Sequence, residues 1–301
     1  MTSPRQAEAT AKGRYYVRPG DDAASLISVT NVLSVGCAKP ALVPWAAKIA
    51  AEYAIEHQGE LMVRSRTDRD GAIKDIKTQV TVARDKAADL GSRIHALAEA
   101  HALGTTLAPE DGDDTAEKYV AQYRRFLDDF DIDLEQHVEA TELTVANPAL
   151  GYAGTLDLML WLPLDGFLAG QAVSRVDDTE RSLWIVDLKT SATRAATSVY
   201  GEYALQLTAL RRCTEMWLPD GTVTAFPGQQ IKGAAVLNLR QRTYELIPLP
   251  SGTEEWRAFQ GCLALAKWMH TAGHDINGGE YRPVGPSGRT KPKRTTTRKA
   301  A

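Results

Sequence analysis

An aspartate and a lysine end an otherwise apolar segment, where these two residue types could do chemistry. Residues 183–189 read Leu-Trp-Ile-Val-Asp-Leu-Lys, so Asp187 and Lys189 are two positions apart. Because side chains alternate along a strand, both charges point to one face. Charges in such a place are costly unless they are paired, bind a metal or face a cleft. A metal-dependent hydrolase uses this pair directly: the carboxylate binds Mg²⁺, while the ammonium positions or activates water and offsets developing phosphate charge.

A second lone acid lies one expected strand earlier. Asp157 is the only charge in the apolar run 156–162, and Gly154 before it permits close approach of a backbone or a ligand. Two such carboxylates on neighbouring strands repel each other unless a cation bridges them. Two readings remain open from these residues: a metal site, or a strand-end salt bridge at Asp187 beside a hydrogen-bonded turn carboxylate at Asp157.

The Asp-x-Lys tripeptide is a weak motif by itself, and the chain contains it twice. Asp75 and Lys77 form the other copy, in a charge-rich stretch of helical composition. Residues two apart on a helix do not share a face. We therefore exclude Asp75 and Lys77 from the candidate site.

The elements that must position Asp157 and Asp187 follow from a change of period near residue 134. Helical patterns come before it, whereas alternation and β-branched residues predict strands after it. The expected order is several helices followed by β-β-β-α-β-β-α. Helices are expected at 44–54, 70–103, 115–131, 199–217 and 254–271, strands at 138–146, 152–162, 183–189, 233–239 and 244–249, and a short β-prone or cap-like segment at 28–35.

A single domain is the simplest organisation of these elements. We expect a flexible N-terminal arm at residues 1–25, one domain at 26–281 and a basic disordered tail at 282–301. The domain divides into a helical part at 40–131, an α/β core at 134–250 and a closing helix at 254–271.

Composition excludes several classes of protein. The chain has 301 residues, 44% of them hydrophobic and 24% charged, as in ordinary globular proteins. No run approaches the roughly 18 apolar residues of a membrane span, and the N-terminus lacks the apolar stretch of a secretory signal. Three scattered cysteines exclude a disulfide framework and a metal site built on clustered thiolates. We expect an intracellular protein with reduced, buried thiols and no membrane partner.

Charge is distributed unevenly along the chain. The net charge is −3, from 35 basic and 38 acidic residues. Residues 282–301 contain seven basic residues and no acid, so residues 1–281 carry a net −10. A basic tail would add salt-dependent, sequence-independent affinity for a polyanion. The alternative for this tail is a solvated end, and the two are compatible.

Four elements in this order resemble the PD-(D/E)xK nuclease superfamily, in its branch of RecB-type and phage recombination exonucleases. Gly154 to Asp157 matches a Gly-x-x-Asp strand, and Asp187 to Lys189 matches the Asp/Glu-x-Lys strand that follows it. Gln206 stands where the family has a glutamine helix, and His95, with Gly91 four residues before it, matches the upstream helical histidine. The resemblance covers roughly residues 90–240. It departs at Leu210, where the family pattern Gln-x-x-x-Tyr has tyrosine.

The resemblance implies a fold and a metal site. The fold would be an α/β restriction-endonuclease-like core, a mixed central sheet flanked by helices, with a helical N-terminal part. His95, Asp157, Asp187 and the backbone carbonyl of Leu188 would bind one or two Mg²⁺ ions, with Mn²⁺ expected to substitute. The branch with an iron–sulfur cluster needs four cysteines, so we expect no such cluster.

The resemblance also implies roles for residues that touch water and substrate. Lys189 would orient and help deprotonate the attacking water, and Gln206 would hold the lysine, the water or the phosphate. Other candidates stay open between a role in the site and a plain surface role: Glu142 as a further acid, Tyr203 as a hydroxyl one turn before Gln206, and Thr190, Ser191 and Arg194 as contacts to substrate phosphates.

The function that the resemblance implies is a metal-dependent DNA exonuclease of phage-type recombination or DNA repair. Its expected substrate is duplex DNA with free ends, and its expected location is the cytoplasm of a bacterial or phage-infected cell. A homo-oligomer and a single-strand annealing or binding protein are candidate partners. The alternatives are a structure-specific or defence endonuclease of the same superfamily, a nucleic-acid-binding protein that keeps the fold without turnover, and an unrelated α/β protein whose acids form salt bridges.

Overall fold

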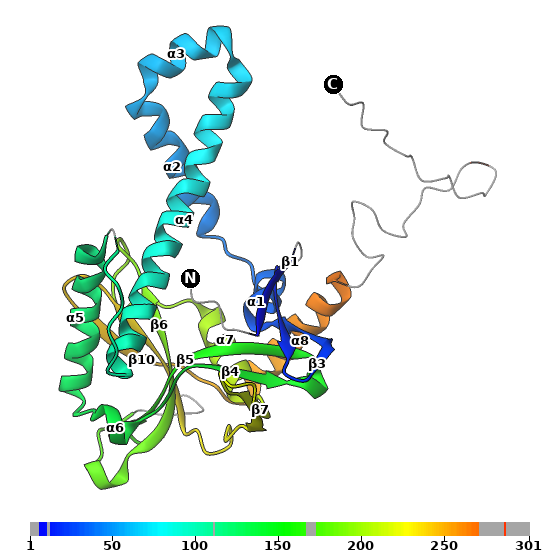
Figure 1. The fold of residues 1–301 in the computed structure, drawn as a ribbon. Helices are drawn as coiled ribbons and strands as arrows, with labels where there is room; N and C mark the ends of the chain where they lie inside the picture. The colour runs from blue at the N-terminus through cyan, green and yellow to red at the C-terminus, as the bar shows by residue number, and fades with distance from the viewer. Residues whose placement is uncertain (1–5, 11–12, 111, 167–172, 271–285, 287–301) are drawn as a thin grey trace.

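The computed structural model describes residues 6–10, 13–110, 112–166, 173–270 and 286. The predicted basic tail at 282–301 lies outside these described residues except at position 286. The chain is an α/β protein with a mixed sheet flanked by helices (Figure 1).

The central strands form in the order that the apolar runs predict. β4 (Val138–Asn147), β5 (Tyr152–Leu162) and β6 (Ser182–Thr190) pair antiparallel in sequence order. β9 (Gly233–Leu239) pairs parallel to β6, and β10 (Tyr244–Pro248) pairs antiparallel to β9. All five predicted strands are confirmed within one residue at each end.

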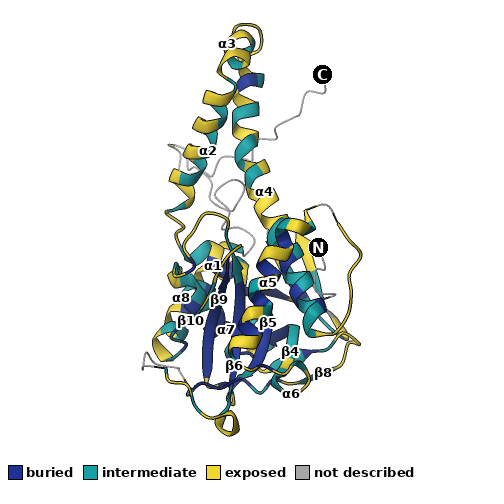
Figure 2. Cartoon of the chain, turned by 90° about the vertical axis from the view of Figure 1, so that its left-hand side faces the viewer, coloured by how far each residue is buried: buried dark blue, intermediate teal, exposed yellow. Residues whose placement is uncertain are grey.

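Helices cover both faces of this sheet. On one face lie α1 (Val29–Gly36), α7 (Gly201–Arg211) and α8 (Thr253–His270), packed around Ile185 of β6. On the other face, the second half of α4 (Arg69–Ala102) and all of α5 (Asp113–Asp129) pack against Trp184, Val186 and Leu188. The central strands are therefore buried between two helical layers, and Figure 2 shows them mainly in dark blue, the colour of buried residues. The two clusters also confirm that Ile185 and Leu188 point to opposite faces, as the alternation of β6 predicts.

The N-terminal residues form a small sheet, so the predicted flexible arm at 1–25 is wrong for its described part. β1 (Ala7–Thr10), β2 (Gly13–Arg18) and β3 (Asp21–Ser28) pair antiparallel in sequence. β3 then pairs parallel to the start of β5, which joins this sheet to the core. The polar and small composition concealed these strands because most of their side chains stay at the surface. Tyr16 of β2 and Leu26, Ile27 and Ser28 at the end of β3 are buried.

Two other predictions near the core are corrected in detail. The segment at 28–35 is the helix α1, capped by the Ser28 hydroxyl, which accepts from the backbone N–H of Asn31. The helix predicted at 199–217 ends at Arg211, because the chain that follows returns to the sheet. There β7 (Glu215–Trp217) pairs with β4 and with β8 (Val223–Ala225).

The helical part contains a projecting arm. α2 (Leu42–Glu56), α3 (Gln58–Thr67) and the first half of α4 extend away from the sheet, and mainly exposed and half-buried residues cover them (Figures 1 and 2). α4 has 34 residues, so the same helix continues from this arm to the sheet, where Ile94 and Ala98 are buried. This continuity brings the second half of α4 over the end of β6. The short helix α6 (Leu134–His137) leads into β4.

The three cysteines are free thiols. Cys213 is buried, as predicted, whereas Cys37 and Cys262 are half-buried, with their Sγ atoms 4.0 Å apart. None of the helices in the described ranges combines the length and the apolar character that a bilayer crossing requires.

Candidate active site

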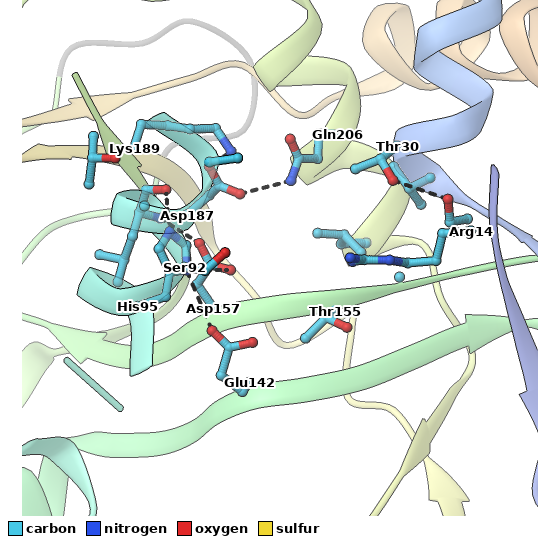
Figure 3. Close-up of a pocket in the computed structure, with 18 of the residues that line it drawn as sticks. Arg14, Thr30, Ser92, His95, Glu142, Thr155, Asp157, Asp187, Lys189 and Gln206 are labelled. Carbon is cyan, nitrogen blue, oxygen red and sulfur yellow. Dashed lines mark hydrogen bonds and ion pairs between the residues drawn. The ribbon is translucent and has the colours of Figure 1, made fainter. Parts of the chain in front are cut away.

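A cleft of about 420 Å³ opens where α4 crosses the ends of the central strands. Its floor comes from β5 and β6, and its walls come from α4, α7, β2 and the start of α1. The predicted residues that line it are His95, Glu142, Asp157, Asp187, Leu188, Lys189, Thr190 and Gln206. Figure 3 shows the acids, His95 and Lys189 on one side of this cleft, with Arg14 and Thr30 on the other.

Three carboxylates lie in register on three adjacent strands. Leu158 of β5 pairs with Val186 of β6, so the antiparallel register places the preceding residue, Asp157, opposite Asp187. On its other side, Asp157 lies opposite Glu142 of β4, between the pairs of Thr141 and Leu143. Like charges so placed destabilise a sheet unless protons or a cation neutralise them. The register of the sheet therefore creates a site of concentrated negative charge.

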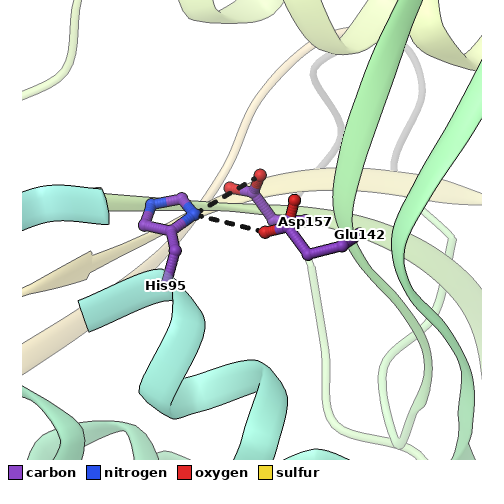
Figure 4. A group of neighbouring side chains, drawn as sticks. All are labelled: His95, Glu142 and Asp157. Carbon is purple, nitrogen blue, oxygen red and sulfur yellow. Dashed lines mark ion pairs between the residues drawn. The ribbon is translucent and has the colours of Figure 1, made fainter. Parts of the chain in front are cut away.

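Glu142 has an unusual backbone. Its φ is 45°, in the left-handed region that residues other than glycine rarely adopt. Such a conformation costs about 1–3 kcal/mol and persists only where the surrounding structure holds it. Here it interrupts the regular strand and directs the carboxylate toward His95 (Figure 4).

His95 faces these acids from α4. Its Nδ1 lies 3.5 Å from Glu142 Oε1 and 3.6 Å from Asp157 Oδ1, while its Nε2 lies 3.1 Å from the carbonyl oxygen of Leu188 (Figure 4). Burial opposes protonation of the ring, but the carboxylates of Asp157 and Glu142 outweigh it and raise the pKa of His95 to about 9. The bond to Leu188 fixes the ring so that Nδ1 points at the carboxylates.

Asp157 binds the backbone of Leu188, the residue between Asp187 and Lys189. Its Oδ2 accepts a 2.7 Å hydrogen bond from the backbone N–H of Leu188. Burial raises the pKa of Asp157, and the nearby Glu142 adds to the rise, while His95 and Lys189 oppose it. The backbone of Leu188 is thus held by Asp157 at its N–H and by His95 at its carbonyl oxygen.

Asp187 and Lys189 form an ion pair, and two side chains of α7, Gln206 and Tyr203, contact it. Asp187 is buried, and the amide of Gln206 donates a 2.8 Å hydrogen bond to its Oδ1. The Lys189 ammonium pairs with Asp187 Oδ2 and lies 5.0 Å from the centre of the Tyr203 ring. Burial raises the pKa of Asp187, and the Asp157 carboxylate adds to the rise, whereas the Lys189 ammonium opposes it. For Lys189, burial lowers the pKa, but Asp187 and Asp157 outweigh burial and raise it.

The donor set fits a divalent cation. The ligand atoms of His95, Glu142 and Asp157 all lie within 4.8 Å of one another. Carboxylate oxygens suit Mg²⁺ and Mn²⁺, and an imidazole nitrogen suits Mn²⁺. Asp187 lies beside this group, and its charge contributes to the raised pKa of His95. The compact group thus contains Glu142, which the resemblance left open, whereas Asp187 is engaged by Gln206 and Lys189.

The candidate phosphate contacts separate into two groups. Thr190 lines the cleft, and its Oγ1 would lie 3.4 Å from a Cβ placed on Gly91 of α4. Ser191 and Arg194 lie outside the residues that line it. The Ser191 hydroxyl accepts from the backbone N–H of Arg194, and the Arg194 guanidinium lies 4.4 Å from the centre of the Tyr200 ring.

The opposite wall contains residues that the sequence patterns did not identify. Arg14 and Tyr16 of β2, with Ser28 and Thr30 at the start of α1, line the cleft. The Tyr16 hydroxyl lies 2.9 Å from Thr155 Oγ1, and the Ser28 and Thr30 hydroxyls lie 3.0 Å apart. No sequence signal marked Arg14 and Tyr16, because they lie on a strand in a segment that reads as a loose arm, and the β-prone or cap-like pattern at 28–35 did not mark Ser28 and Thr30 as site residues.

Gly154 of the Gly-x-x-Asp motif lies against Leu210, the residue at which the chain departs from the family pattern. A Cβ on Gly154 would lie 2.6 Å from Leu210 Cδ2 and 3.3 Å from Val29 Cγ2. Glycine therefore lets α7 pack closely on β5, and Leu210 fills that contact. Close packing of α7 is what brings Gln206 within reach of Asp187.

No protein-family model matches the chain, and no curated protein sequence matches it. What the site does must therefore be inferred from the geometry of its own residues.

Proposed function

We propose that this chain is a Mg²⁺-dependent deoxyribonuclease that hydrolyses phosphodiester bonds from the ends of duplex DNA. The observation that carries the proposal is the alignment of Asp157 and Asp187 on adjacent strands, with Lys189 paired to Asp187 and with His95 and Glu142 beside Asp157. A bound cation would relieve the repulsion among these carboxylates.

The topology supports a restriction-endonuclease-like core. β4, β5 and β6 form an antiparallel meander, α7 crosses one face, and β9 returns parallel to β6. Asp157 and Asp187 thus lie on the second and third strands of the meander, and Gln206 lies on the crossover helix.

Each residue of the site has a distinct task in this proposal. His95, Glu142 and Asp157 would hold the cation, with the Leu188 carbonyl and Asp187 next to them. The bound cation would polarise the scissile phosphate and lower the pKa of a bound water. Lys189 orients the attacking water and offsets the negative charge that develops on the phosphate. Gln206 keeps the Asp187 carboxylate in place for this pair.

The shape of the cleft supports attack at an end. The cleft has a volume of about 420 Å³, and β2 with the start of α1 forms one wall, so we propose that it takes the end of a single DNA strand rather than an intact duplex. We therefore propose an exonuclease, with recombination or repair as its setting and with a basic tail that adds affinity for DNA.

The test compares linear and covalently closed duplex DNA of the same sequence, each incubated with the protein and Mg²⁺. We expect release of nucleotides from the linear duplex, none from the closed circle, and none from either when EDTA replaces Mg²⁺. Cleavage of the closed circle would contradict the exonuclease and support an endonuclease. Binding of DNA that ignores EDTA, without any degradation, would support a binding protein instead.

A further inference from the structure

The loop at 191–200 connects β6, which carries Asp187 and Lys189, to α7, which carries Gln206. It leaves β6 just after Lys189 and enters α7 at Tyr200, which precedes the first residue of the helix. The rings of Tyr200 and Tyr203 pack edge to face, with centroids 5.4 Å apart, and Tyr203 lies against the Lys189 ammonium. The loop thus joins the strand that carries Lys189 to the helix that carries Tyr203.

A buried arginine holds this loop from the neighbouring strand. Arg240 directly follows β9 and is 9% exposed. Its guanidinium donates to the carbonyl oxygens of Arg194 at 2.7 Å and Ala195 at 2.9 Å, and reaches that of Lys189 at 3.4 Å. It also donates to the carbonyl of Leu239 at 2.7 Å. All of these partners are backbone carbonyls.

Asn238 extends the same contact further along the loop. It is 1% exposed and lies in register with Lys189 on the parallel neighbour of β6. Its side-chain nitrogen donates to the carbonyl oxygens of Ala196 at 2.7 Å and Ser198 at 2.9 Å. Asn238 and Arg240 together hold the loop backbone from residue 194 to residue 198.

A buried cation that donates to carbonyl groups alone is costly to maintain, because desolvation opposes it and, in the part of the chain that the structure describes, no carboxylate accepts a hydrogen bond from the guanidinium. Arginine is suited to this place since its planar group offers five N–H donors in fixed directions. A lysine would keep the charge, but its single ammonium group could not donate to all the carbonyls that the Nε, Nη1 and Nη2 atoms of Arg240 reach. The arrangement thus depends on the shape of the guanidinium as well as on its charge.

We propose that Arg240, with Asn238, is a positioning residue for Lys189. By fixing the loop at 191–200, the two side chains set α7 against the end of β6, so that Tyr203 and Asp187 hold the ammonium at the cleft. This inference rests on the proposed nuclease function, because the orientation of Lys189 matters only if Lys189 acts on water and phosphate.

The test uses Arg240→Lys, with Arg242→Lys as the matched control, since Arg242 is an exposed arginine two residues further on. Amide hydrogen exchange is measured for residues 191–200, and kcat, KM for linear duplex DNA and the Mn²⁺ concentration for half-maximal rate are measured on the same proteins. We expect faster exchange in this loop and a kcat lower by about 10–100-fold for Arg240→Lys. KM, the Mn²⁺ requirement and the control variant should stay unchanged.

Each of the following results would overturn the inference. Unchanged amide hydrogen exchange of residues 191–200 in Arg240→Lys would show that the guanidinium does not hold the loop. Faster exchange with wild-type kcat would show that the loop does not position Lys189. Equal losses of kcat, Mn²⁺ response and melting temperature would assign Arg240 a purely structural role. Absence of turnover by the wild-type protein would overturn the proposed function and the positioning role with it. Equal turnover by the wild type and by Arg240→Lys would overturn the positioning role alone.

Discussion

The two Asp-x-Lys tripeptides of this chain lie in opposite environments. Asp187 and Lys189 end a strand that is buried between two helical layers, and the lysine pairs with the aspartate of its own tripeptide. Asp75 and Lys77 lie on the projecting half of α4, where Asp75 pairs with Arg64 of α3 and Lys77 is exposed. The same residue types thus form a cleft-lining pair in one place and a solvated helix surface in the other.

The difference shows that burial and neighbours, and not the tripeptide, create the candidate chemistry. Asp187 has Asp157 beside it on the adjacent strand, and Gln206 holds its other oxygen. Burial raises the pKa of Asp187, while no comparable environment surrounds Asp75, whose side chain is 33% exposed. If this reading is right, matched substitutions in the two tripeptides should have very different effects.

The largest contrast is expected between the two lysines. Lys189→Ala removes the ammonium that orients water and offsets phosphate charge, so turnover of end-labelled duplex DNA should fall by about 10²–10³-fold. Lys77→Ala should leave turnover unchanged, because Lys77 is exposed on the arm. Equal activity of the two variants would remove Lys189 from the site.

The next contrast concerns metal binding by the two sets of acids. Asp157→Asn keeps an oxygen that can accept from Leu188 but loses the charge, so the Mn²⁺ concentration that raises the melting temperature should increase at least about tenfold. Asp75→Asn should leave the Mn²⁺ response as it is and cost about 0–1 kcal/mol of stability, as for a partly exposed ion pair. Unchanged Mn²⁺ stabilisation in Asp157→Asn would show that Asp157 is not a ligand of the cation.

The pH dependence of metal binding should report on His95. The ring is protonated below its pKa of about 9 in the metal-free site, so a cation at Nδ1 must displace that proton. Affinity for Mn²⁺ should therefore rise with pH, by about tenfold per unit for one displaced proton, between pH 6.5 and 8. Titration calorimetry in buffers of different ionisation enthalpy measures the released proton, and His95→Ala should reduce that release. A pH-independent affinity would place the cation away from His95.

The smallest effect concerns the packing that brings α7 to the site. Gly154→Ala places a methyl group against Leu210 and Val29, so the free energy of unfolding should fall by about 1–3 kcal/mol. Gly201→Ala is the matched control, because nothing lies within 4 Å of a Cβ there. Denaturant unfolding of both variants measures the difference. Equal stability would mean that α7 can shift without cost.

Much of the core was predictable because its strands are long apolar runs. β4, β5 and β6 form where the sequence predicts them, and the lone acids in them are the ones that the sheet brings together. The N-terminal strands were not predictable, because few of their side chains are buried and β3 is stabilised by pairing with β5, which is distant in sequence. Arg14 and Tyr16 on the far wall of the cleft were missed for that reason.

Other features of the site depend on backbone details that no residue pattern reveals. Glu142 could be named as a candidate, but its contact with His95 depends on a left-handed backbone conformation within β4. Likewise, Ser191 and Arg194 follow Lys189 directly in sequence, yet the loop turns them toward their own backbone and toward Tyr200. Proximity along the chain was a poor guide where the chain leaves the strand.

The central claim is that His95, Glu142 and Asp157 form a divalent-cation site beside Asp187 and Lys189. Anomalous diffraction from crystals soaked in Mn²⁺ tests it most directly. The account predicts an anomalous peak within about 2.0–2.4 Å of His95 Nδ1 and of oxygens of Glu142 and Asp157. A site without a peak under saturating Mn²⁺, with Lys189 still paired to Asp187, would contradict the account and leave these acids as a structural ion-pair cluster.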